Sequence, residues 1–318
     1  MSVLDFFLNP PTGLTIPIIL AISFVLGLLH GGTPDEHTWP ITFSYSIGSY
    51  TSRGGLKSGL VFSTGFAVQR AILTALGFLG LASIYLVYNL DGPIYVLVGI
   101  AMFGAGWFLL RGSDIHLPLD HLLERLFGQF FREHTHHRTV AERSPLPETE
   151  VKPVPLRLAA VHGFIAGWGI GGFAAIIVFV LAPEMPNVLW AAAVGGFFGL
   201  GTMVMQMITG ALFARLARLK RLSLAQMQRV GRRTAARTLY VGGLAFVAIG
   251  LVVAFAPWIE NYALGTGSSI PNLNSIGVAF VLIVTVVGGI GGYSLWKGYR
   301  EILAPAAGPE RRSEPNPP

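Results

Sequence analysis

Long apolar stretches alternate with short polar segments along the whole chain. A helix needs about 20 consecutive apolar residues to cross a membrane interior about 30 Å thick. By that measure the sequence predicts seven membrane-spanning helices, at residues 14–37, 60–88, 92–110, 156–182, 187–213, 238–257 and 274–296. The predicted fold class is therefore an all-α polytopic membrane protein of the cell membrane.

The composition agrees with this pattern and excludes several classes of function. Hydrophobic residues make up 52% of the chain and charged residues 12%, whereas soluble domains carry about 25% charged residues. There is no cysteine, which excludes disulfides and thiolate metal or redox sites. No glycine run is followed by the Lys-Ser/Thr pair of a phosphate-binding loop, so ATP-driven transport by this chain is not expected.

The lysines and arginines lie on one side of the predicted topology. Of the 22 basic residues, 21 fall in alternate connecting segments, at residues 38–57, 111–157, 215–237 and 297–318. Because basic segments stay in the cytoplasm, the N-terminus is predicted outside and the C-terminus inside. The net charge of +6 is thus an orientation signal, and the expected partner is the lipid bilayer and not nucleic acid.

The first predicted span contains a polar interruption. Gly31–Gly32 suits the end of a helix, because glycine accepts left-handed backbone angles. Thr33 stands three residues before Glu36, the spacing of a capping box, and Pro34 occupies the favoured first helical position. One helix is therefore expected to stop near His30 and another to start at Thr33. Broken helices are tolerated at membrane depth where they line a cavity, and transporters use them to build ion sites.

His30, Asp35, Glu36 and His37 surround this break. At 1.5 Å per residue from Ile16, the break lies about 20 Å into the bilayer, nearer the cytoplasmic side. Ionisable groups at such depth are costly unless they are paired or coordinated. A divalent cation would remove the repulsion between the carboxylates and use neutral imidazole as a ligand. Imidazole and carboxylate without thiolate suit Ni²⁺, Co²⁺, Zn²⁺ or Fe²⁺.

Two other interpretations of the cluster remain open. Asp35 and Glu36 could serve only to cap a helix start, where the helix dipole favours negative charge, while the histidines form local hydrogen bonds. The same residues could also relay protons, as His and carboxylate chains do in secondary transporters.

His162 and Arg70 are two further ionisable residues within predicted spans. His162 lies at a depth similar to that of His30 and is also followed by glycine, so it is a candidate metal ligand. A single histidine on an apolar helix is more often a packing residue. The side chain of Arg70 is expected to extend to the cytoplasmic interface; alternatively, Arg70 is a charge partner of Asp35 or Glu36.

The predicted cytoplasmic loop at 112–155 contains five of the eight histidines: His116, His121, His134, His136 and His137. Its first half predicts an amphipathic helix on the membrane surface. The tract with His134, His136 and His137 is typical of metal binding or sensing; alternatively, it belongs to a solvated connector. This loop would separate a first transmembrane bundle from a second, giving segments 1–111, 112–155, 156–303 and a disordered tail, 304–318.

The sequence LLHGGTPDEH resembles the motif of the nickel–cobalt transporter family (the NicO and NiCoT groups of the LysE-type superfamily), which reads His, four residues, Asp, His. The resemblance implies secondary transport, two three-helix repeats and a metal-selective role for His30, Asp35 and His37. Glu36 is additional and moves the second histidine from six to seven residues after the first. The second-span histidine of some members is absent.

The predicted function is therefore secondary transport of a divalent transition metal, Ni²⁺ or Co²⁺ before Zn²⁺ or Fe²⁺, without an organic cofactor or an enzymatic reaction. One alternative is a proton-coupled transporter of an organic solute or anion. Another is a metal-binding membrane module that does not transport, or a hydrolase using a metal-bound water, although the sequence has no nucleophile motif. The direction of transport, the coupling ion and the oligomeric state have no signal in the sequence.

Overall fold

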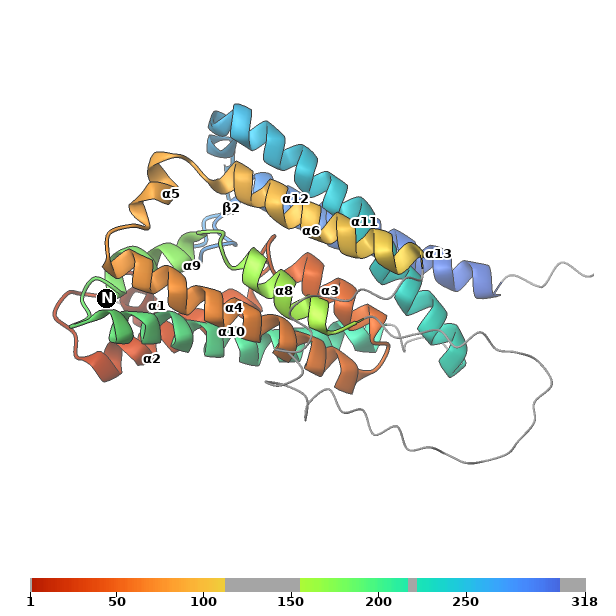
Figure 1. The fold of residues 1–318 in the computed structure, drawn as a ribbon, viewed down its shortest axis with the longest axis horizontal. Coiled ribbons are helices and arrows are strands. Elements are labelled where there is room, and N and C mark those ends of the chain that lie inside the picture. Colours follow the sequence, from red (N-terminus) through yellow and green to blue (C-terminus); the bar gives the residue numbers. More distant parts are fainter. Residues whose placement is uncertain (1, 112–154, 217–221, 304–318) are drawn as a thin grey trace, which may run out of the picture.

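The computed structural model describes residues 2–111, 155–216 and 222–303, and helices account for most of them (Figure 1). The four longest helices are α4 (Ser52–Phe78), α6 (Asp91–Arg111), α10 (Val188–Leu216) and α11 (Leu224–Phe255). The shorter α-helices are α1 (Val3–Leu8), α2 (Ile16–Gly32), α3 (Trp39–Gly48), α5 (Ser83–Val87), α8 (Arg157–Ala166), α9 (Gly172–Ala175), α12 (Val278–Ile283) and α13 (Gly292–Leu303). The remaining elements are the π-helices η1 (Ile176–Leu181) and η3 (Val284–Gly291), the 3₁₀ helix η2 (Pro257–Asn261) and two short strands, β1 (Leu264–Gly265) and β2 (Ser275–Ile276).

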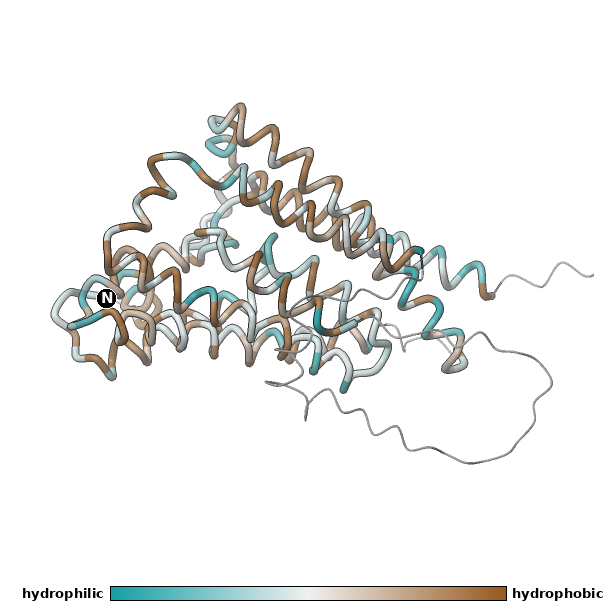
Figure 2. Tube along the Cα trace, viewed as in Figure 1, coloured by the Kyte–Doolittle hydropathy of each residue, from teal (hydrophilic) through white to brown (hydrophobic). Residues whose placement is uncertain are grey.

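Five described helices are long and apolar enough to cross a membrane: Ser52–Phe78, Asp91–Arg111, Val188–Leu216, Ala225–Phe255 and Val278–Ile302. Three shorter apolar helices accompany them, at Ile16–Gly32, Arg157–Ala166 and Gly172–Leu181. Large apolar side chains are exposed along the long helices, and Figure 2 shows hydrophobic residues along α6 and α11 with hydrophilic ones toward α13. Such exposure is expected where lipid replaces water. The predicted class, an all-α polytopic membrane protein, is confirmed at this level; the count of seven spans stays a prediction.

The chain order of a broken helix followed by two long helices occurs twice. In the first half, α2 and α3 precede α4 and α6; in the second, α8, α9 and η1 precede α10 and α11. Corresponding members pack against each other, since α4 lies along α10 and α6 along α11. α2 packs on α10, and α8 packs on α4. The interrupted segments thus lie inside a frame of long helices.

The first predicted span differs from the structure in two ways. α2 ends at Gly32 as expected, but the helix resumes only at Trp39 and not at Thr33. The first half of the segment 38–57, expected to be a connection between spans, is instead the helix α3, in which Pro40–Gly48 is buried throughout. Hydroxyl-bearing residues made this stretch look polar, although it packs between α4, α10 and α11. The break therefore lies inside a two-part helical element that runs from Ile16 to Gly48.

Other predicted boundaries also change. The fourth predicted span, 156–182, is interrupted between Ala166 and Gly172. The second, 60–88, ends at Phe78 and continues through a turn into α5. α11 begins at Leu224, well inside the segment 215–237 that was expected to be a loop. Four basic residues of that segment lie in the first half of α11: Arg229, Arg232, Arg233 and Arg237.

Candidate metal site at two broken helices

The first break has a local cause in the sequence. Thr33 has extended backbone angles (φ −91°, ψ 148°), because a residue before proline is disfavoured in the helical region. It closes α2 instead of opening α3. Its amide donates to the carbonyl of Leu29 at 3.0 Å, and its hydroxyl donates to the same carbonyl at 2.9 Å. The predicted capping box between Thr33 and Glu36 is therefore wrong.

Asp35 organises the start of α3 instead. Its Oδ1 accepts hydrogen bonds from the amides of His37 at 3.0 Å and Thr38 at 2.9 Å, and its carbonyl accepts from Trp39. Both side-chain contacts lie in the turn before α3, whose N-cap residue, Thr38, has no side-chain cap hydrogen bond. The second oxygen, Oδ2, lies 3.7 Å from His30 Nδ1. Asp35 thus combines hydrogen bonds to the backbone of this turn with a contact to the histidine at the end of α2.

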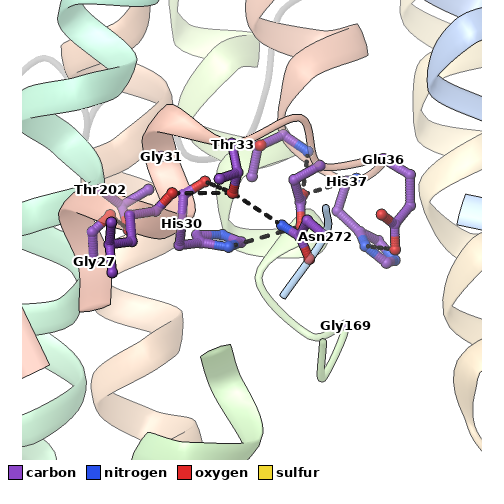
Figure 3. Close-up of polar contacts among 12 residues, drawn as sticks. Gly27, His30, Gly31, Thr33, Glu36, His37, Gly169, Thr202 and Asn272 are labelled. Carbon is purple, nitrogen blue, oxygen red and sulfur yellow. Dashed lines mark hydrogen bonds and ion pairs between the residues drawn. The ribbon is translucent and has the colours of Figure 1, made fainter. Parts of the chain in front are cut away.

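Glu36 and His37 complete a compact polar group (Figure 3). His37 Nδ1 lies 3.1 Å from Glu36 Oε1, which also accepts a hydrogen bond from the hydroxyl of Tyr95 at 3.2 Å. Asp35, Glu36 and His37 each offer a ligand atom, and these atoms lie within 4.8 Å of one another. Ligands that bind one ion at about 2.1 Å lie about 3–4 Å apart, so a small contraction would let the three share a cation.

All four predicted ligands around the break are buried: the exposed fraction is 4% for His30, 4% for Asp35, 8% for Glu36 and 7% for His37. Each histidine has its Nδ1 directed at a carboxylate, and its Nε2 has no hydrogen-bond partner within the described ranges. For His37, the 3.1 Å contact between Nδ1 and Glu36 favours the tautomer that leaves Nε2 free for a metal; the 3.7 Å contact of His30 is an ion-pair distance and longer than a hydrogen bond. The arrangement can therefore supply imidazole ligands with carboxylates as ligands or as outer supports.

Aromatic rings hold both histidines in place. The imidazole of His30 packs against the rings of Phe66, Phe173 and Phe198, with centroids 5.2–6.0 Å away. His37 is stacked on Tyr95 at 5.1 Å with an interplanar angle of 7°. These contacts exclude water from the ring faces and strengthen electrostatic interactions at the ring edges.

Arg70 is a buried cation beside this group and does not extend to the interface. Its side chain is 2% exposed, its Nη2 donates to the carbonyl of Gly169 at 3.0 Å, and its guanidinium lies 4.6 Å from the ring centroid of Phe66. The predicted direct pairing with Asp35 or Glu36 is not found among the ion pairs of the described residues. Arg70 therefore acts on the carboxylates at a distance, while it anchors the loop that carries Gly169.

That loop, residues 167–171, is a second helix break that the sequence analysis missed. It joins α8 to α9 and lies against the first break: a Cβ built on Gly169 would be 2.6 Å from His37 Cε1. Ile170 donates its amide to the hydroxyl of Tyr85, which in turn donates to Asp91 Oδ1. The glycine-rich run GWGIGG could have indicated this break, but glycines of this kind are equally typical of close contacts between helices.

A loop from the far end of the chain covers the first break. Strands β1 and β2 pair antiparallel, with Leu264 opposite Ile276. Between them, the side chain of Asn272 donates to the hydroxyl of Thr33 at 3.3 Å. Pro271 lies against Gly172, at the start of α9. Nothing in the local sequence around Asn272 indicates this contact, because the two bonded residues are 239 positions apart.

Glu260 adds a carboxyl group in the same loop region, beyond the end of α11. Partial burial raises its pKa to about 7, and the negative charges of Asp91 and Glu36 act in the same direction, whereas His37 opposes them. This carboxyl group therefore changes its charge near neutral pH and is electrostatically coupled to the buried group.

His162 is not part of the group that the structure assembles. It is buried on α8, and its Nδ1 lies 3.0 Å from the hydroxyl of Tyr45 and 2.8 Å from the carbonyl of Leu158. Its Nε2 is buried without a hydrogen-bond partner among the described residues, as in His30 and His37, so its role as a metal ligand stays a prediction. The loop histidines His116, His121, His134, His136 and His137 lie outside the described residues, as does the tail 304–318.

No protein-family model, curated protein or solved structure matches this chain. The fold and the site therefore rest on their own geometry, and the likeness of LLHGGTPDEH to the nickel–cobalt transporter motif stays an expectation.

Proposed function

We propose that this protein is a secondary transporter of divalent transition-metal cations, Ni²⁺ or Co²⁺ by preference, and that its substrate binds at the first helix break. One observation carries the proposal: Asp35, Glu36 and His37 are buried, and their ligand atoms lie within 4.8 Å of one another. His30 joins this group through Asp35. Two carboxylates and neutral imidazoles offset the charge of a divalent cation, which could not enter an apolar bundle alone.

The donor set supports the choice of metal. Imidazole nitrogen and carboxylate oxygen without thiolate suit intermediate divalent ions, and nickel and cobalt accept such mixed sets. Broken helices that meet near the middle of a bundle are the usual way in which secondary transporters build substrate sites. Arg70 limits the negative charge of the empty site, which lets the buried carboxylates persist when no cation is bound.

The proposed topology has seven crossings. Five are the long helices, and the two interrupted elements, α2–α3 and α8–α9–η1, supply the others. With basic segments in the cytoplasm, the N-terminus lies outside, and the loop that carries Asn272 covers the site from the outer face. In this arrangement α3 lies between the site and the cytoplasm.

The test is metal content and uptake in matched histidine variants. His37→Ala and His30→Ala should abolish metal retention in the purified protein, measured by elemental analysis, and uptake into proteoliposomes. His162→Ala is the control, because this histidine is equally buried but lies outside the group; it should retain both. The site assignment is wrong if the His30 and His37 variants bind and transport like wild type while all variants reach the membrane.

One observation favours a second function, proton-coupled transport of an anion or an organic acid. The Nε and Nη1 atoms of Arg70 are buried and have no hydrogen-bond partner in the described part of the chain, and guanidinium groups suit carboxylate and phosphate ligands. In that case purified wild-type protein would contain no metal, chelators would leave transport unchanged, and Arg70→Gln would abolish transport.

A further inference from the structure

We propose that Thr38, which directly precedes α3, and Thr42 and Ser46 on α3 form one polar face, and that this polar face is a hydrated passage for the cation between the metal site and the cytoplasmic end of α3. This inference rests on the proposed function and extends it to the route that the substrate takes. The three residues are spaced by four along the chain, so they share one face of the helix. Thr38 starts this polar face at the metal site, where its amide donates to Asp35.

The hydroxyls of this polar face lack the hydrogen bond that most described helical hydroxyls make; among the described residues, the hydroxyls of Ser63 on α4 and Thr234 on α11 lack it too. Serine and threonine inside helices usually donate to the carbonyl of the preceding turn. Described hydroxyls that do so belong to Ser44, Ser58, Thr64, Thr74, Thr202, Thr209 and Thr238. Thr42 Oγ1 and Ser46 Oγ are fully buried and have no partner in the ranges that the structure covers. Their oxygens are therefore available to a ligand.

Ser44 shows that this difference belongs to the face and not to the helix. It lies on α3 between the two, is equally buried, and its hydroxyl donates to the carbonyl of Pro40 at 2.7 Å. Buried polar atoms in native proteins almost always have a partner, either protein or water. A row of unpartnered oxygens on one side of α3 thus marks a place where water, or a hydrated ion, supplies the missing hydrogen bonds.

The neighbouring helices contribute to the same region. Gln206 on α10 donates its Nε2 to the carbonyl of Gly31 at 3.4 Å, while its Oε1 is buried without a partner. One turn further along α10, Gly210 lies against Ser46 Oγ. The amide oxygen of Gln206 is thus on the side of α10 that faces the end of α2 and the polar face of α3.

The ligands in this region suit the passage of a cation better than its tight binding. The metal site carries two carboxylates, whereas the polar face offers only neutral oxygen ligands. Conduction needs binding strong enough to replace part of the hydration shell and weak enough to allow release. Hydroxyl and amide oxygens meet that requirement for a hydrated divalent cation that has left Asp35 and Glu36.

The first experiment compares Thr42→Val with Ser44→Ala in the full-length protein. Valine keeps the shape of threonine and removes the hydroxyl. In proteoliposomes, Thr42→Val should lower the initial rate of Ni²⁺ uptake about tenfold, with an unchanged Kd for Ni²⁺ by calorimetry; Ser44→Ala should match wild type in both. A wild-type uptake rate for Thr42→Val overturns the passage, and so does a weakened Kd, which would place Thr42 in the metal site.

A second experiment does not depend on transport. The chain has no cysteine, so single Ser46→Cys and Ser44→Cys variants have no background labelling. Only a thiol in contact with water forms the reactive thiolate. A small cationic thiol reagent should modify Ser46→Cys much faster than Ser44→Cys. Equal, slow reaction of both overturns the hydrated passage even if metal uptake is confirmed. If the passage is hydrated but wild type binds no metal, the proposed function fails and the route does not serve a metal cation.

Discussion

The two helix breaks lie against each other but differ in their residue composition. The break at 33–38 is rich in ionisable groups and contains Asp35, Glu36 and His37, whereas the break at 167–171 consists of glycines with Trp168 and Ile170. In the first, side chains supply the chemistry. In the second, the absence of side chains lets the backbone at Gly169 approach the imidazole of His37.

This difference indicates that the first break supplies the ligands and the second break supports them. Charged side chains need a rigid neighbour to hold them at the required separation, and a close backbone can provide it without adding a competing ligand. Arg70 holds the second break, because its guanidinium donates to the carbonyl of Gly169, and it lies on α4, a helix that packs on both halves. Changes to the two breaks should therefore have effects of different kinds and sizes.

The largest effect is expected from Asp35→Asn. Asparagine keeps the oxygen that accepts from the amides of His37 and Thr38, so the break should fold and the thermal stability without metal should change little. The lost charge should weaken Ni²⁺ binding about 100-fold, measured by calorimetry. Asp5→Asn, an exposed carboxylate in the described N-terminal helix, is the control and should bind like wild type. An unchanged affinity for Ni²⁺ in Asp35→Asn would show that the carboxylate of Asp35 is not part of the metal site.

A smaller effect is expected from the glycine break. In Gly169→Ala, the new Cβ would lie 2.6 Å from His37 Cε1 and 2.7 Å from Nε2, so the imidazole or the loop must shift. Metal affinity should fall about tenfold, within the range of lost outer support. Gly196→Ala is a matched control, because a Cβ there meets nothing within 4 Å. If Gly169→Ala and Gly196→Ala have the same affinity, the second break does not position His37.

The smallest effect should be a pH dependence set outside both breaks. Because the pKa of Glu260 is raised to about 7, its charge is lost as the pH falls through that value. Uptake from the outer side should then decrease about threefold more in wild type than in Glu260→Gln, since one attracting charge disappears. Initial rates between pH 6 and 8 measure this. The carboxylates of Asp91 and Glu36 and the imidazole of His37 are common to both proteins, so parallel pH profiles would show that Glu260 contributes nothing.

Local sequence signals were sufficient for the uniformly apolar helices and for the first break. The predicted spans 92–110 and 187–213 agree within a few residues with α6 and α10, because burial in lipid depends on the hydrophobicity of each residue. The end of α2 also has a local cause, in the glycines before Pro34. The restart was misplaced because the carboxylate of Asp35, and not the hydroxyl of Thr33, satisfies the free amides.

Other features could not be predicted because their causes lie in distant parts of the chain. α3 looks polar, yet it is buried, since it packs against helices α10 and α11, which begin more than a hundred residues later. The depths of His30 and His162 looked equal along their helices, but only the packing of α8 against α4 directs His162 to Tyr45 and away from the group.

The sequence by itself determined that the chain is an apolar helical protein with a break that concentrates two carboxylates and two histidines, because hydrophobicity and backbone preference act over a few residues. Only the tertiary structure decided that Gly169 supports His37, that Asn272 reaches Thr33 and that Arg70 is buried beside the site. These contacts join residues about 100 to 240 positions apart, and their geometry follows from how long helices pack, which no local pattern encodes.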